Sequence, residues 1–116
     1  MDLAVIAFPT DNYYHKIAEL EIERNLIYYA SAAAEEMGFE NFDELQQAVR
    51  RAMELCEARG LSINSNFRRI FKCSPLGLVF DWRLSALAYH LVQLNGDPSN
   101  NRVAKLQIEL LKSYYS

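Results

Sequence analysis

The chain of 116 residues has few of the side chains on which metal, cofactor and disulfide chemistry depends. Its two cysteines, Cys56 and Cys73, form no C-x-x-C pair, and we interpret them as reduced thiols of a cytosolic protein. Its two histidines, His15 and His90, are isolated and give no metal-ligand spacing. The four glycines are scattered, so no phosphate-binding loop is expected. We therefore predict no enzyme, no cofactor and no metal site.

Long apolar runs are also missing. No segment approaches the ~20 apolar residues of a membrane span, and Met1–Phe8 lacks the basic start and cleavage site of a signal peptide. Leu3–Phe8 is instead predicted to be a first strand that ends at Pro9. With 51% hydrophobic and 23% charged residues, the composition is typical of a globular protein. These features predict a single cytoplasmic domain over residues 1–116 that does not bind a membrane.

The formal net charge of −3 conceals an uneven distribution along the chain. Up to Val49 there are ten acidic and two basic residues, a net of −8, and from Arg50 onward five acidic and ten basic residues, a net of +5. Such a split predicts a molecule with two faces, of which the basic one can meet phosphate. The alternative is that folding mixes the two halves and removes the asymmetry.

The segment before residue 30 is open to two interpretations. In the first, Thr10-Asp11 caps a short helix over 12–18, and the alternation in Leu20-Glu21-Ile22-Glu23 predicts a half-buried strand. A turn at Arg24-Asn25 then returns the chain as a second strand over 26–29, which completes a hairpin. In the second, one helix runs straight through residues 12–24.

The clearest element is an amphipathic helix from residue 42 to Arg59. Asn41 is its expected N-cap, Glu44 three residues later gives a capping-box arrangement, and Gly60 ends the helix. Six apolar side chains share one face at a spacing of 3.6 residues: Phe42, Leu45, Val49, Ala52, Met53 and Cys56.

A short alanine-rich helix is predicted before it, over residues 32–37, with Ser31 as its cap and Gly38 at its end. The two helices and the turn between them have the proportions of a helix-turn-helix.

The second half of the chain predicts a hairpin followed by two helices. After a loop or single turn over 62–67, Ile70–Cys73 and Leu78–Phe80 flank the type I turn Ser74-Pro75-Leu76-Gly77. Helices over 85–95 and 98–114 follow. At their junction we expect a left-handed Gly96 and an Asp97 cap. The predicted buried stripe of the last helix is Val103, Leu106, Leu110, Leu111 and Tyr114. The predicted fold class is α+β, a mostly helical single domain with two small β-hairpins and a helix-turn-helix-like element.

Several segments occur in the order found in one known family. The stretch Asp81–Pro98, ending in Asn-Gly-Asp-Pro, resembles a conserved block of the DNA-damage-inducible DinD family and of BRO-type (BRO-N) and phage antirepressor domains. Upstream, the resemblance continues through three further segments and covers about residues 17–107: Ile27-Tyr28-Tyr29-Ala30-Ser31, Met37-Gly38-Phe39, and Asn41-Phe42 through Cys56 and Gly60 to Asn66-Phe67.

The resemblance implies a regulatory role in DNA metabolism, of phage or DNA-damage-response type, with transcription regulation and DNA binding among the expected functions. Three positions depart from the family pattern. Ser31 replaces an arginine, Asn66 replaces a histidine, and the basic content directly after Asn-Gly-Asp-Pro is thinned to Ser99-Asn100-Asn101, with Arg102 following. Each departure removes positive charge, and Asp43 and Glu44 at the start of the long helix repel phosphate.

The first functional hypothesis is that DNA phosphates are contacted by a basic hairpin and by the outer face of the long helix. Side-chain amides of residues 46, 47, 64 and 66 are candidates for contacts to base edges. The residues expected to bind nucleic acid are Arg50, Arg51, Arg68, Arg69, Lys72 and Arg83.

The second hypothesis is a protein–protein interaction module, antirepressor-like or modulating a recombination protein, without direct DNA binding. The resemblance suggests a repressor or a recombination protein as the partner. The pairs Tyr13-Tyr14, Tyr28-Tyr29 and Tyr114-Tyr115 place tyrosine at the surface, where it is favoured in interfaces, and the last pair is a candidate for homodimer contacts. A nuclease reading would need Glu19, Glu21 and Glu23 to share one face of a strand and hold Mg²⁺.

Overall fold

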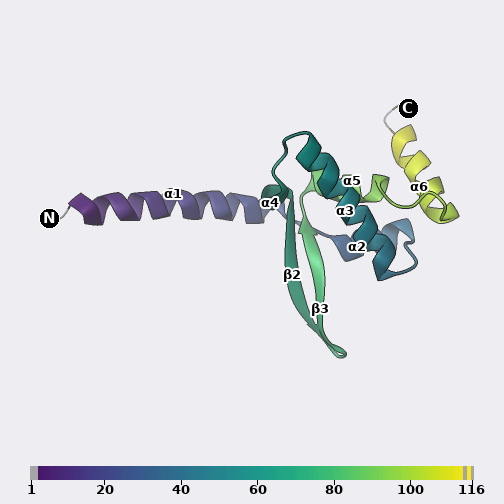
Figure 1. The fold of residues 1–116 in the computed structure, drawn as a ribbon, viewed down its shortest axis with the longest axis horizontal. Helices are drawn as coiled ribbons and strands as arrows, with labels where there is room; N and C mark the ends of the chain where they lie inside the picture. Colours follow the sequence, from purple (N-terminus) through teal and green to yellow (C-terminus); the bar gives the residue numbers. More distant parts are fainter. Residues whose placement is uncertain (1–2, 114, 116) are drawn as a thin grey trace.

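The computed structural model describes residues 3–113 and 115, and describes side chains from residue 13 onward. Six helices and three strands follow one another in this part of the chain (Figure 1). Their bounds are α1 Leu3–Asn25, β1 Tyr28–Tyr29, α2 Ala30–Met37, α3 Phe42–Ala58, α4 Ile63–Asn66, β2 Phe67–Ser74, β3 Gly77–Leu84, α5 Ala86–Leu94 and α6 Asn101–Lys112. The fold is α+β and mostly helical, as predicted.

The core lies between α2, α3, α5 and the base of the hairpin. Alanines at positions 30, 33, 48, 52 and 88 are fully buried, and their small size lets the helices approach one another closely. Leu84 and Phe67, opposite each other at the base of β3 and β2, complete this cluster. The sheet and the three helices therefore share one hydrophobic core, which fixes the hairpin at its base.

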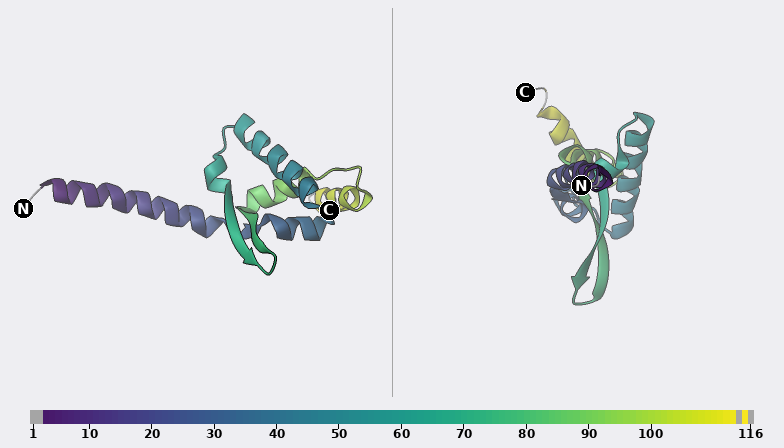
Figure 2. Two further views of the ribbon diagram at one scale, coloured as in Figure 1. Left: turned by 60° about the horizontal axis from the view of Figure 1, so that its bottom comes forward. Right: turned by 90° about the vertical axis from the view of Figure 1, so that its left-hand side faces the viewer.

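Two elements project from this body. In Figure 1, α1 runs away from the helices, and the β2–β3 hairpin extends in a different direction. Both views in Figure 2 agree with this arrangement, and the hairpin twists along its length. The sheet order is β1-β3-β2, antiparallel throughout, and only the base of β3 has neighbours on both sides.

The amino-terminal predictions are corrected by α1. Leu3–Phe8 is not a strand and Pro9 does not end it, since a single helix continues through Asn25. The predicted strands over 20–23 and 26–29 and their hairpin are also wrong, and the continuous-helix interpretation of residues 12–24 is confirmed. Four alternating residues are too few to separate a strand period from a helix period.

The α2–α3 pair largely follows the predictions. Gly38 ends α2 with φ 76°, and Gly60 follows α3 with φ 72°. Asn41 caps α3 by accepting a hydrogen bond from the Glu44 N–H at 2.9 Å. Ser31 is no cap, because α2 begins one residue before it, at Ala30.

The junction of α5 and α6 differs from its prediction. Gly96 is not among the glycines with positive φ, and it is required for space: a Cβ there would lie 2.6 Å from the Phe39 ring. Asn100, not Asp97, caps α6. Of the predicted stripe, Val103 is buried, residues 106 and 110 are half-buried, Leu111 is exposed, and Tyr114 lies outside the described residues.

No helix among the described residues is both long enough and apolar enough to cross a membrane.

Candidate interaction site on the hairpin

The hairpin has two faces of opposite character. Directly paired residues of antiparallel strands share a face, and successive residues alternate between faces. We call one side the aromatic face; beyond its buried base it carries Arg69, Phe71, Cys73, Leu78, Phe80 and Trp82. We call the other side the ion-pair face; it carries Arg68, Ile70, Lys72, Val79, Asp81 and Arg83.

The aromatic face leaves large apolar side chains open to solvent. Phe71 is 68% exposed and Leu78 is 73% exposed, and Leu76 at the turn is 98% exposed. Clustered exposed apolar side chains on a monomer mark interaction sites. The outer half of the hairpin therefore has the composition of an interface core that lacks its partner.

Helix α3 supports the inner part of this face. The Phe42 ring packs edge-on against Phe80 at a centroid distance of 5.0 Å, and Phe71 contacts Phe80 at 6.4 Å. The indole N–H of Trp82 donates to the side-chain oxygen of Gln46 at 3.0 Å. The first turns of α3 thus hold the rings at the base while the rings farther out remain uncovered.

Arg69 is the only charged residue on the aromatic face. Its guanidinium carbon lies 5.7 Å from the Phe80 ring centroid and 6.0 Å from that of Trp82. No carboxylate of the described residues forms an ion pair with it. The stacked rings orient this cation but do not neutralise it.

The ion-pair face is organised around Asp81, which is 6% exposed. Its carboxylate accepts hydrogen bonds from the Ser31 N–H at 3.1 Å, the Ser31 hydroxyl at 2.5 Å and Lys72 Nζ at 2.9 Å. Burial by itself raises the pKa of Asp81, but these hydrogen bonds and one from the Trp82 N–H lower it more, so the net pKa shift is downward. Asp81 therefore ties α2 and both strands together as an anion.

Most of the residues predicted to bind nucleic acid make internal contacts. Arg68 forms ion pairs with Glu19 at 3.3 Å and Glu23 at 3.7 Å, both on α1. Arg83 donates to the backbone carbonyls of Leu26 at 2.9 Å and Glu23 at 3.1 Å. These two arginines hold the end of α1 against the hairpin, and so they contribute to the architecture of the molecule.

Of the other predicted residues, Lys72 and Arg51 bond to other elements, whereas Arg50 does not. Lys72 binds Asp81 and lies 3.9 Å from the Tyr29 ring centroid. Arg51 donates two hydrogen bonds, at 3.2 and 3.0 Å, to the carbonyl of Asn95 at the end of α5. Arg50 is exposed on α3 and contacts Gln47 and Glu54 on its own helix. Of the six predicted residues, only Arg50 and Arg69 form no hydrogen bond or ion pair with another element, and Arg69 contacts β3 through ring faces alone.

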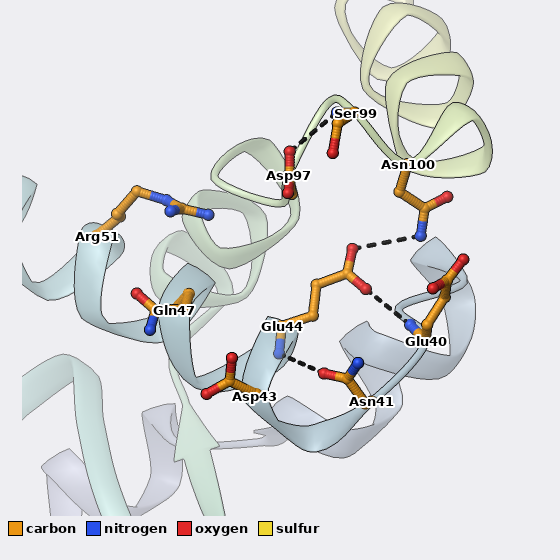
Figure 3. A pocket seen from close by; sticks show the side chains of 9 residues that line it. All are labelled: Glu40, Asn41, Asp43, Glu44, Gln47, Arg51, Asp97, Ser99 and Asn100. Carbon is orange, nitrogen blue, oxygen red and sulfur yellow. Dashed lines mark hydrogen bonds between the residues drawn. The ribbon is translucent and has the colours of Figure 1, made fainter.

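A hollow of about 400 Å³ lies beside the start of α3 (Figure 3). Arg51 is its only cation, and the Glu44 carboxylate accepts from the Glu40 N–H and from Asn100. Hydrogen bonds from Ser99 lower the pKa of Asp97. The carboxylates that line it are Glu40, Asp43, Glu44 and Asp97. This end of α3, which a helix-turn-helix presents to the groove, repels phosphate.

The shared strand face that a magnesium site at Glu19, Glu21 and Glu23 would need does not form. Because residues 19–23 are helical, Glu19 and Glu23 share a face, and both contact Arg68, whereas Glu21 lies on another face. Among the described residues, no group of three or more histidine, cysteine or acidic side chains is placed to hold a metal ion.

The tyrosine pairs differ from one another. Tyr13 and Tyr14 are both exposed, whereas Tyr28 stacks on Tyr89 at 4.5 Å and leaves its neighbour Tyr29 at the surface.

The sequence patterns did not predict the exposed aromatic face of the hairpin. The available signal was the alternation Arg69-x-Phe71-x-Cys73, which a longer predicted strand would have placed on one face.

Comparison of the chain with protein-family models, with curated proteins and with solved structures gives no match. The resemblance to DinD and BRO-type domains rests on the sequence motifs alone and stays a prediction.

Proposed function

We propose that this protein is a non-enzymatic, cytoplasmic protein-interaction module that binds its partner through the aromatic face of the β2–β3 hairpin. The observation that carries the proposal is the aromatic face, where Phe71 and Leu78 are largely exposed around an unpaired Arg69. Exposed aromatic and aliphatic side chains around one arginine are typical of the centre of protein interfaces. The resemblance to antirepressor and damage-inducible domains suggests a repressor or a recombination protein as the partner.

The placement of the basic residues supports this choice over DNA binding. Arg51, Arg68, Lys72 and Arg83 form hydrogen bonds or ion pairs with other elements. A phosphate contact would have to compete with these interactions. The acidic hollow at the start of α3 adds repulsion where a DNA backbone would approach.

The test places a photoreactive benzoylphenylalanine at position 71, or at the exposed position 57 on α3 as the control, in the organism that makes the protein. We expect a discrete crosslinked protein from position 71 only, and its loss when Leu78→Ser is added. Identical products from both positions would contradict the proposal.

One observation favours DNA contact as a second candidate function. The chain order helix α2, helix α3, hairpin β2–β3 places a hairpin after a helix pair, as in a helix-turn-helix with a wing, and Arg50 and Arg69 are exposed. Fluorescence anisotropy with a labelled duplex and a labelled single strand at two salt concentrations tests this candidate. Steeply salt-dependent binding that Arg50→Glu with Arg69→Glu abolishes would establish it. Arg68 is unsuitable for this test because it anchors α1.

A further inference from the structure

Strand β2 forms a free edge of the sheet from Arg69 to the turn, whereas at its base the Phe67 N–H donates to the Ile63 carbonyl of α4. In the sheet order β1-β3-β2, β3 lies on one side of β2 and no described strand lies on the other. The ladder between β2 and β3 runs through eight consecutive pairs, from Phe67↔Leu84 to Ser74↔Gly77, without a bulge. Natural edge strands are blunted by proline, bulges, a covering element or charged side chains. Strand β2 contains neither proline nor bulge, and its charged side chains, at positions 68, 69 and 72, are all basic.

The register determines which backbone groups point outward. Ser74 and Gly77 flank a two-residue turn, so they form a hydrogen-bonded pair. At the other end of the ladder, the Ser85 N–H donates to the Asn66 carbonyl at 3.0 Å, which also places the hydrogen-bonded pairs at even-numbered residues. Even-numbered residues of β2 therefore bond to β3. The N–H and C=O groups of Arg69, Phe71 and Cys73 point away from β3 and are open to a further strand.

We propose that the free edge of β2 accepts an extended segment of another protein as a fourth strand, and that this segment alternates acidic and apolar residues on the side of the aromatic face. The proposal rests on the proposed function and specifies how the partner binds. Backbone groups at positions 69, 71 and 73 would supply the affinity, and side chains on the aromatic face would supply the selectivity.

The selectivity follows from two neighbouring positions. Arg69 and Phe71 are two residues apart on the aromatic face, so a paired strand presents one side chain beside each. A carboxylate beside Arg69 gives the guanidinium the anion that no described residue gives it. An aliphatic side chain beside Phe71 covers a ring that is now 68% exposed.

A second copy of this chain fits the edge less well. Antiparallel pairing of β2 with itself about Ile70 places Arg68 opposite Lys72, and like charges in that position are unfavourable. Pairing about Phe71 avoids this repulsion but places no carboxylate beside either Arg69, because β2 contains no acidic residue. The charge of the edge therefore favours an acidic partner segment.

The probe is a synthetic eight-residue peptide with threonine on one face and alternating glutamate and valine on the other. Titration of the labelled peptide is followed by fluorescence anisotropy, and amide hydrogen exchange of the protein is measured with and without it. We expect protection of the Arg69, Phe71 and Cys73 amides to rise at least tenfold. The amides of Ile70 and Lys72, which already bond to β3, should change little.

Matched variants separate the two parts of the proposal. Cys73→Pro removes one outward N–H and should weaken binding at least fivefold relative to Cys73→Ser. A peptide methylated on alternate amide nitrogens makes the same test on the unaltered protein. Arg69→Gln should weaken binding about tenfold, and a peptide with lysine in place of glutamate should bind no better than that variant.

The outcomes are distinct from those of the function test. If crosslinking from position 71 succeeds while the outward amides gain no protection, the partner covers the face without joining the edge, and the strand-addition proposal fails alone. If light scattering shows a dimer with the same amides protected, the edge binds a second copy and the acidic partner is wrong. If neither the peptide nor a crosslinked protein is detected, both proposals fail.

Discussion

The helical body together with the ion-pair face of the hairpin differs from the aromatic face in how completely polar and apolar groups find partners. In the body and on the ion-pair face, arginines meet carbonyls or carboxylates, alanines fill close helix contacts, and Asp81 binds three residues. On the aromatic face, rings lie open and Arg69 has no carboxylate partner among the described residues. Clustered apolar side chains that remain exposed are typical of a surface that binds a partner. The comparison therefore separates residues that build the molecule from residues that contact something else.

The largest effect is expected where the hairpin meets the body. Asp81→Ala removes the acceptor for Ser31, Lys72 and the Trp82 N–H at a part-buried site. We expect the free energy of unfolding to fall by about 3 kcal/mol, because several hydrogen bonds to a charged acceptor are lost together. Urea denaturation followed by Trp82 fluorescence measures it. Equal stability of the variant and the wild type would show that the hairpin is not anchored through Asp81.

The next effect concerns space in the body. Gly96→Ala places a Cβ 2.6 Å from the Phe39 ring and 2.7 Å from Val103 Cγ1, so the α5–α6 junction must move. A loss of about 2 kcal/mol in the free energy of unfolding is expected from overpacking.

Gly60→Ala is the matched control, since no atom lies within 4 Å of its Cβ position while its φ of +72° strains any other residue. Its cost should be about 1 kcal/mol, from the backbone alone. If Gly96→Ala is no worse than Gly60→Ala in the same denaturation assay, the packing at this junction is looser than described.

Sequence patterns predicted the elements that local signals determine, including the hairpin around Ser74–Gly77, better than contacts between distant segments. Caps and stops such as Asn41, Gly38 and Gly60 act within a few residues, so they were visible in the sequence and fixed α2 and α3 correctly. The role of Arg68 depends on Glu19 and Glu23, more than forty residues away, and no local pattern indicates such a pair. A basic side chain in a sequence shows a charge but not whether folding has already paired it.

The buried side-chain amide of Gln93 is an exception to the pairing of polar groups in the body. Gln93 is 1% exposed, and neither its side-chain nitrogen nor its oxygen has a hydrogen-bond partner among the residues that the structure describes. Gln93→Met keeps the length of the side chain and removes the unpaired polar atoms, so it should stabilise the fold by about 1 kcal/mol. A rise in the thermal midpoint measured by circular dichroism would confirm this. A fall would mean that the amide makes a contact the wild type needs.

Part of the Asp81 contribution depends on pH. The folded-state pKa of Asp81 lies below its ordinary value of 3.8, so the stabilisation is fully present above about pH 4 and is lost as the pH falls through the folded-state pKa. The difference in unfolding free energy between wild type and Asp81→Asn should therefore shrink as the pH is lowered from 5 to 2.5. A difference that stays constant over this range would show that the carboxylate charge contributes nothing.

The smallest effect on stability, and the sharpest test of the comparison, comes from two adjacent arginines on opposite faces. Arg68→Gln removes the ion pairs to Glu19 and Glu23, whose side chains are about half exposed, so the loss should be below about 1 kcal/mol. The visible result should be faster amide exchange over residues 19–25 of α1. Arg69→Gln should leave α1 exchange unchanged, because its guanidinium contacts only ring faces of β3, and its loss of stability should also stay below about 1 kcal/mol. If Arg69→Gln loosens α1 as much as Arg68→Gln does, the two faces of the hairpin do not have the separate roles assigned to them.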